Sequence, residues 1–233
     1  MVISKYILLS SRSWVYAGVG FTLIFPVLWL TLLRIVGNPQ YLQYFMVGTV
    51  VNTSFLIPFI GTAQDMAYIR HGSTIYTVLF SNGADHWDIA LGYITQTLLL
   101  TLPSIASLLL LSMAILGVRY GVAQIMTTLA TALVIALSSS LLGYALGIGV
   151  RNYRITNQVS QVIPWPLLLL APVYYPITIL PQAIRLVSLA LPTTYMALAI
   201  HGSLVLNPME LIRAVSVFII ICGCSCSLVG ESF

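Results

Sequence analysis

Apolar residues in this chain are gathered into long runs that short polar segments separate. Each run is close to the roughly 20 residues with which a helix crosses a hydrocarbon core of about 30 Å. The pattern therefore predicts an all-α polytopic membrane protein with six transmembrane helices in a single domain, residues 1–233. The predicted spans are residues 14–36, 41–63, 89–116, 123–150, 155–174 and 211–229.

Three segments outside these runs have patterns of their own. Residues 1–13 mix apolar and basic side chains, which is typical of an amphipathic helix lying on the membrane surface. Residues 66–80 belong to a polar interlude, residues 64–88, but are themselves rich in apolar side chains, and such side chains need a covering surface. We therefore expect residues 66–80 to form a helix that docks on another protein.

Residues 175–206 are the third such segment, and prolines interrupt them and the residues just before them. Proline removes an amide donor and clashes with the preceding turn, so one continuous helix is not expected. We predict two short external helices that enter the membrane and return. The alternative is a seventh transmembrane helix over residues 184–206, which Arg185, Pro192 and His201 disfavour. The prolines concerned are Pro172, Pro176, Pro181 and Pro192.

Composition and charge agree with a membrane protein. Hydrophobic residues make up 59% of the chain and charged residues 6%, whereas soluble domains carry about 25% charged residues. The net charge of +4 is too scattered to be a nucleic-acid patch. Basic residues favour the cytoplasmic side of a membrane, and their positions predict a multi-pass protein of the cell membrane with a cytoplasmic N-terminus. This topology places Lys5, Arg12, Arg70, Arg151 and Arg154 inside and Arg34, Arg119, Arg185 and Arg213 outside.

The sequence offers no catalytic or metal site. It contains no phosphate-binding loop of the GxxxxGK[ST] type, and Lys5 is the only lysine. The three cysteines fall within residues 222–226 at a spacing that cannot converge on one metal from a helix. The three histidines, His71, His86 and His201, are far apart in the sequence. We therefore predict neither an enzyme nor a cofactor in this chain.

The proline-rich segment also carries a family resemblance. The segment contains, in order, alanine-proline, an aromatic residue, a further proline, leucine-proline, an arginine and a proline-threonine-tyrosine sequence. This order resembles the signature before the last span of type-two ABC exporter permeases. The earlier polar interlude resembles that family's cytoplasmic motif. The first set is Ala171 to Pro176, Leu180-Pro181, Arg185 and Leu191 to Tyr195, and the second is Arg70, Gly72, Ser73, Thr74 and Leu79.

The resemblance implies a membrane subunit that moves substrate outward and works with a separate ATPase. Residues 66–80 would then be the coupling helix, contacting the ATPase through Arg70, Gly72, Ser73, Thr74 and Leu79. Two ATPase copies would carry ATP and Mg, and a second permease copy or a homologous permease would complete the pathway among membrane lipids. His71 and Tyr76 stand where this family often has acidic residues, and Leu191 replaces an asparagine.

Polar and aromatic residues of the predicted spans are candidates for the pathway and its external gate. No charged residue lies near the middle of a predicted span, which favours an amphipathic or lipid-like substrate over a small ion. An ion-coupled transporter or channel is the alternative function, and a structural membrane partner is a further one. The candidates are Asn52, Thr53, Ser54, Asn157, Gln158, Gln161, Tyr174, Tyr175 and Pro176.

Overall fold

The computed structural model describes residues 42–83, 86–117 and 119–209, together with scattered helical positions between residues 24 and 35 and at 212 and 216. Every regular element in this part of the chain is a helix, so the predicted all-α class is confirmed. The predicted surface helix, residues 1–13, and most of the first and last predicted spans lie outside the described residues.

Three helices of the described chain are long and apolar enough to cross a membrane. They are α3 (Leu42–Ala67), α5 (His86–Leu116) and α6 (Val122–Gly149). The first of these spans is longer than predicted, since the apolar helical stretch runs from Gln43 to His71 and includes Asp65 near its end. The sequence had placed this boundary at residue 63, where polar residues begin.

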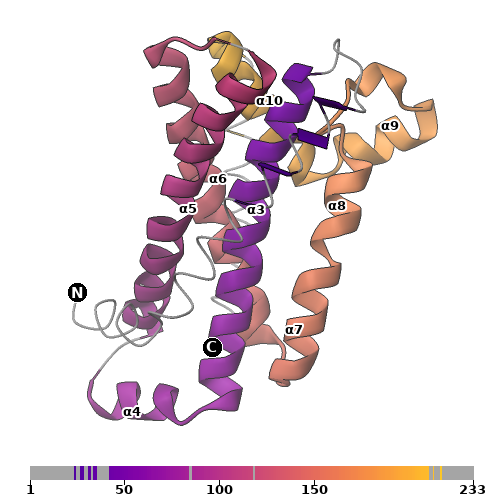
Figure 1. The fold of residues 1–233 in the computed structure, drawn as a ribbon. Coiled ribbons are helices and arrows are strands. Elements are labelled where there is room, and N and C mark those ends of the chain that lie inside the picture. The colour runs from indigo at the N-terminus through magenta and orange to yellow at the C-terminus, as the bar shows by residue number, and fades with distance from the viewer. Residues whose placement is uncertain are drawn as a thin grey trace.

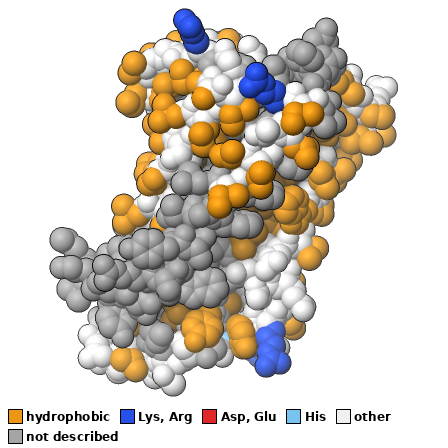
Figure 2. Space-filling model, in the orientation of Figure 1, with side chains coloured by type: hydrophobic (Ala, Val, Ile, Leu, Met, Phe, Trp, Pro, Cys, Tyr) orange, Lys and Arg blue, Asp and Glu red, His pale blue; other side chains and the backbone are white. Residues whose placement is uncertain are grey.

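Helix α3 is the centre of the bundle, with α5, α6, α7 and α10 packed around it (Figure 1). In the most apolar window of α3, 67% of residues are buried, against 33% for α5. Leu91, Leu99 and Leu110 of α5 are among the exposed side chains, as expected of a helix that faces lipid. On the face shown in Figure 2, the blue Lys and Arg side chains lie near the two ends, with hydrophobic side chains between them.

Two glycines let α6 approach α3 closely. A Cβ atom placed on Gly147 would lie 2.7 Å from the carbonyl oxygen of Ala63, and one placed on Gly143 would collide with the carbonyl oxygen of Phe59. The four-residue spacing puts both glycines on one face of α6, which is the packing arrangement of small-xxx-small motifs. These glycines therefore fix the contact between the two most closely packed helices.

The predicted fifth span, residues 155–174, is broken in the structure. It consists of α7 (Tyr153–Val162) and α8 (Pro164–Leu170), neither of which is long enough to span a membrane alone. Ile163 between them keeps helical dihedral angles, and the two helices follow one another along α3 in Figure 1. Pro164 opens α8, and extended backbone at Ala171 ends it earlier than predicted.

The proline-rich segment that follows contains three short helices. They are η3 (Ile177–Ile179), α9 (Gln182–Leu189) and α10 (Pro192–Val205). Pro181 precedes α9 and Pro192 opens α10, positions that suit proline because the first amides of a helix have no intrahelical acceptor. Helices α9 and α10 meet at 83°, so residues 184–206 are not one straight helix.

Candidate functional site

A short segment follows α3 at one end of the bundle. A π-helical turn, η2 (Tyr68–Gly72), leads through extended Ser73 into α4 (Ile75–Ser81). The sequence predicted one helix over residues 66–80, but the structure divides that range among the end of α3, η2 and α4. The extended backbone at Ser73 causes the division, and the Ser73 hydroxyl donates to the Ile69 carbonyl at 3.3 Å. We call Tyr68–Ser81 the end segment.

The inner side of the end segment is anchored in the bundle. Ile69 is 3% exposed and belongs to a small apolar core with residues of α3, α5 and α6, against which Leu79 packs. The outer side is different, because Tyr68 and Val78 are each 53% exposed. The segment is thus held firmly from within while it presents apolar side chains outward.

A pocket with basic side chains lies beside the end segment. Its volume is about 500 Å³, and it is lined by Arg70, His71, Ile148, Gly149 and Arg151. Arg70 donates from Nη1 to the Ile148 carbonyl at 3.5 Å, at the C-terminal end of α6, where a cation is favourably placed. This pocket joins the end segment to the turn that connects α6 and α7. None of its described lining residues is acidic.

The predicted pathway residues on α7 form an exposed polar stripe. Asn157, Gln158 and Gln161 lie on one face of the helix at helical spacing, and Gln161 Nε2 donates to Asn157 Oδ1 at 3.3 Å. The opposite face is buried, and there Gln64 of α3 donates to the Ser160 hydroxyl at 3.4 Å. Helix α7 therefore presents amides away from its own bundle.

The predicted pathway residues on α3 occupy a different environment. Thr53 and Ser54 are buried, and their hydroxyls donate to the carbonyls of Thr49 and Val50, four residues earlier in the helix. Asn52 is half-buried, and its Oδ1 has no hydrogen-bond partner. These three side chains pack within the subunit and are separate from the exposed stripe of α7.

The predicted gate residues lie in the break after α8. The ring of Tyr174 covers Gly48 of α3, where any Cβ atom would collide with it. The Tyr175 hydroxyl donates to the Leu169 carbonyl at 2.8 Å, and Pro176 precedes η3. The structure thus distributes the nine predicted pathway and gate residues over three places instead of one cluster.

A repeated pattern, which the sequence analysis missed, organises this region. Leucine, proline and tyrosine recur at three-residue intervals, and in each copy the tyrosine hydroxyl donates to the leucine carbonyl, at 2.8 Å in the first and 2.9 Å in the second. The proline interrupts the helix, and the tyrosine satisfies a carbonyl in its last turn. The copies are Leu169-Pro172-Tyr175 and Leu189-Pro192-Tyr195.

Two threonines act in the same way between helices. Thr193 donates to the Leu167 carbonyl of α8 at 2.7 Å, and Thr194 donates to the Ser188 carbonyl of α9 at 2.5 Å. Four hydroxyls therefore satisfy carbonyls near the ends of α8 and α9. The two equal spacings of leucine, proline and tyrosine were the available signal in the sequence.

Comparison with known proteins decides the family. The family model described as ABC-2 type transporter matches residues 2–205. The chain belongs to the ABC-2 type transporter family. The resemblance found in the sequence is confirmed, and this ABC-2 protein is a multi-pass permease, the membrane component of an ABC transporter. The family implies pairing with an ABC ATPase subunit.

No curated protein matches the sequence of this ABC-2 permease. Within the described residues, no group of three or more His, Cys, Asp or Glu side chains could hold a metal ion. The three cysteines of the sequence lie outside the described residues.

Proposed function

We propose that the chain is the permease subunit of an ATP-driven exporter and that a separate ATPase subunit docks on its end segment, Tyr68–Ser81, with two ATPase subunits in the complete transporter. ATP and Mg would be bound by those subunits. The observation that carries this proposal is the end segment itself, which is anchored through Ile69 and Leu79 and presents Tyr68 and Val78 outward. An exposed apolar surface on an anchored element is suited to protein docking.

The same segment offers a direct mechanical connection to the bundle. Helix α3 passes into η2 without interruption, and α3 is the most buried of the three long helices. Its contact with α6 through Gly143 and Gly147 is close and has little room to slide. A displacement of the end segment by an ATPase would therefore move α3 and α6 together.

A second permease subunit, either another copy or a homologous permease, would complete the transport pathway. The amides of Asn157, Gln158 and Gln161 are exposed on α7 in a chain of apolar helices. Polar groups that face hydrocarbon are costly, so such a stripe is favoured where it faces a polar cavity or another subunit. We assign this polar stripe to the wall of the pathway that faces the second permease. In this proposal the N-terminus of the chain is cytoplasmic, and the substrate is amphipathic and lipid-like.

The alternative, an ion-coupled transporter or channel, has weaker support in the structure. It needs an ionisable group near the membrane midplane. Asp65 lies in the span Gln43–His71 but near the end that joins the end segment. The described part of the chain therefore favours the ATP-driven mechanism.

Copurification tests this function. The tagged permease should isolate a stoichiometric ATPase from its native membrane, and Val78→Asp should abolish this association because it places a charge in an apolar docking surface. The matched control is Val122→Asp. Val122 is 74% exposed and is the first residue of α6, at the end of that helix away from the end segment. Retention of the ATPase by a folded Val78→Asp protein would contradict the docking assignment. Absence of any ATPase would contradict the proposed function.

A further inference from the structure

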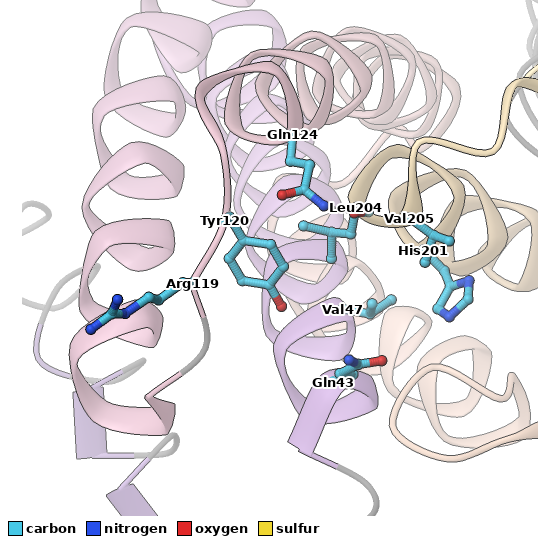
Figure 3. A pocket seen from close by; sticks show the side chains of 8 residues that line it. All are labelled: Gln43, Val47, Arg119, Tyr120, Gln124, His201, Leu204 and Val205. Carbon is cyan, nitrogen blue, oxygen red and sulfur yellow. Dashed lines mark hydrogen bonds between the residues drawn. The ribbon is translucent and has the colours of Figure 1, made fainter.

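A second pocket lies at the end of the bundle remote from the end segment. Its volume is about 300 Å³, and it lies between the first turns of α3, the start of α6 and the end of α10 (Figure 3). The lining is mixed, with three aliphatic and five polar or charged side chains. We call it the remote pocket, and its lining residues are Gln43, Val47, Arg119, Tyr120, Gln124, His201, Leu204 and Val205.

The walls of the remote pocket are held by bonds of their own. Gln124 donates from Nε2 to the Leu204 carbonyl at 2.6 Å and accepts from the Gly121 amide at 2.8 Å, so it joins α6 to α10. The ring of His201 stacks on that of Tyr44, with 5.9 Å between the centroids. These contacts fix the pocket between α3, α6 and α10.

Tyr120 differs from these lining residues in its hydrogen bonding. Its hydroxyl oxygen is buried and has no hydrogen-bond partner. Figure 3 shows this hydroxyl pointing toward α3, on the side of the labelled Val47 and Gln43. Leaving a buried hydroxyl unsatisfied costs free energy, so the site is suited to a molecule that supplies an oxygen at this point.

The other groups around this space indicate what that molecule carries. The amide of Gln43 can donate hydrogen bonds, and Arg119 adds a fixed positive charge. The exposed side chain of Arg119 extends away from the Tyr120 hydroxyl in Figure 3. None of the described lining residues is acidic. The set favours a group that accepts hydrogen bonds and is negatively charged.

The location adds an apolar requirement. The spans Gln43–His71 and Val122–Gly149 both begin beside this pocket, so it lies at the level where hydrocarbon gives way to headgroups. Val205 and Leu206, at the pocket and just after α10, are 57% and 48% exposed. A molecule with an anionic head and an apolar tail would satisfy both surfaces.

We propose that the remote pocket binds the phosphate headgroup of a membrane phospholipid, with Tyr120 and Gln43 donating to the phosphate oxygens and the acyl chains lying along Val205 and Leu206. This site is independent of the ATPase docking surface. It lies at the opposite end of α3 and α6 from Arg70 and the basic pocket.

The test measures the thermal stabilisation of delipidated permease by three probes, which are dioctanoyl phosphatidylglycerol, dioctanoyl glycerol and inorganic phosphate. Dioctanoyl phosphatidylglycerol should raise the melting temperature in a saturable way, whereas dioctanoyl glycerol, which lacks the phosphate, should not. Tyr120→Phe should weaken the apparent affinity about tenfold, as expected when a hydrogen bond to a charged group is lost. Without lipid, the same variant should be as stable as the original protein or more stable, because an unsatisfied hydroxyl has been removed.

Two further variants make the result specific. Gln43→Leu removes an exposed donor without disturbing the core and should also weaken phosphatidylglycerol binding. Tyr153→Phe, at the α7 end of the bundle, should leave it unchanged. Equal affinities of the original protein and Tyr120→Phe would overturn the proposal, as would equal stabilisation by dioctanoyl glycerol. Equal stabilisation by inorganic phosphate would show a site for small anions and overturn the assignment to lipid.

Discussion

Hydroxyl side chains in this permease use their hydrogen bonds in two different ways. Most of those on the long helices, such as Thr53, Thr101 and Ser139, donate to the carbonyl four residues earlier and so bring no unsatisfied polar group to the apolar interior. Thr193 and Tyr195 instead donate across a break in the helix. Hydrogen bonds within a helix satisfy hydroxyl groups in the apolar interior. Hydrogen bonds across a break satisfy the carbonyl groups at the end of a helix.

Close packing at Gly147 gives a stability prediction. Gly147→Ala should destabilise the fold by about 1–3 kcal/mol, the usual cost of overpacking, because the added Cβ atom meets the Ala63 carbonyl. Gly149→Ala is the matched control, since nothing lies within 4 Å of a Cβ atom there. Unfolding in mixed micelles under increasing denaturing detergent measures both. Equal stability of the two variants would show that α6 can shift away from α3.

Tyr120 gives a prediction about alkaline pH. Burial raises the pKa of the Tyr120 hydroxyl above its ordinary value of about 10. The unfolded chain therefore releases this proton first, and stability should fall as pH rises above about 10. Tyr120→Phe should make this fall shallower, and thermal unfolding between pH 8 and 11 measures it. A Tyr120→Phe slope just as steep as that of the original protein would refute the assignment.

At the level of elements, uniform apolar runs were predicted well and interrupted ones poorly. Helices α5 and α6 lie within a few residues of their predicted spans because apolar side chains continue to both ends. The division between η2 and α4 depends on the backbone of Ser73, and the break before α8 depends on two prolines in an otherwise regular run. The pattern of hydrophobic residues does not predict the positions of these breaks.

The candidate site was predictable to a similar degree. The polar residues of α7 and the docking segment at residues 66–80 were singled out from the sequence, and their roles in transport stay predictions. The burial of Thr53 and Ser54 was not, because a serine or threonine on a membrane helix has the same pattern whether it faces a pathway or a neighbouring helix. The remote pocket was also missed, since it joins Gln43, Tyr120 and His201 from three distant parts of the chain.

The hydroxyls at the ends of α8 and α9 give a prediction for these elements. Thr193→Val keeps the shape of the side chain but leaves the Leu167 carbonyl without its donor, and we expect a loss of about 1–3 kcal/mol because Thr193 is buried and Leu167 is half-buried. Hydrogen exchange should show faster opening of α8 and α10. Thr131→Val is the comparison, because the hydroxyl of that buried residue donates within its own helix, to the Thr127 carbonyl at 2.8 Å. Equal exchange in both variants would exclude a special role for Thr193.

The permease as a whole has two ends with different chemistry. One end carries the exposed apolar side chains of the end segment beside the basic pocket, and the other carries the remote pocket, where the apolar stretches Gln43–His71 and Val122–Gly149 begin. Between them, α3 connects both ends through the middle of the bundle (Figure 1). The polar stripe of α7 runs along the outside of this connection, where a second subunit would meet it.

Cross-linking tests the arrangement of two permeases. In a variant with Cys222, Cys224 and Cys226 replaced by serine, Gln161→Cys should form a disulfide-linked dimer in native membranes, because the stripe would face its counterpart in a second copy. Leu99→Cys is the control, since Leu99 is 52% exposed on α5 and faces lipid in our assignment. A dimer through residue 99 but not residue 161 would place the contact on the other side of the bundle.

The repeated leucine, proline and tyrosine pattern has a consequence for how the protein is made. In each copy the hydroxyl and its carbonyl are six residues apart, so each bend can close soon after its residues leave the ribosome. Helices α9 and α10 are together apolar enough to be inserted as a transmembrane segment. The angle between the two helices is nevertheless 83°. We expect the choice between crossing and turning back to be made locally, before the rest of the chain is synthesised. The orientation of the predicted last span, residues 211–229, would then depend on two tyrosines.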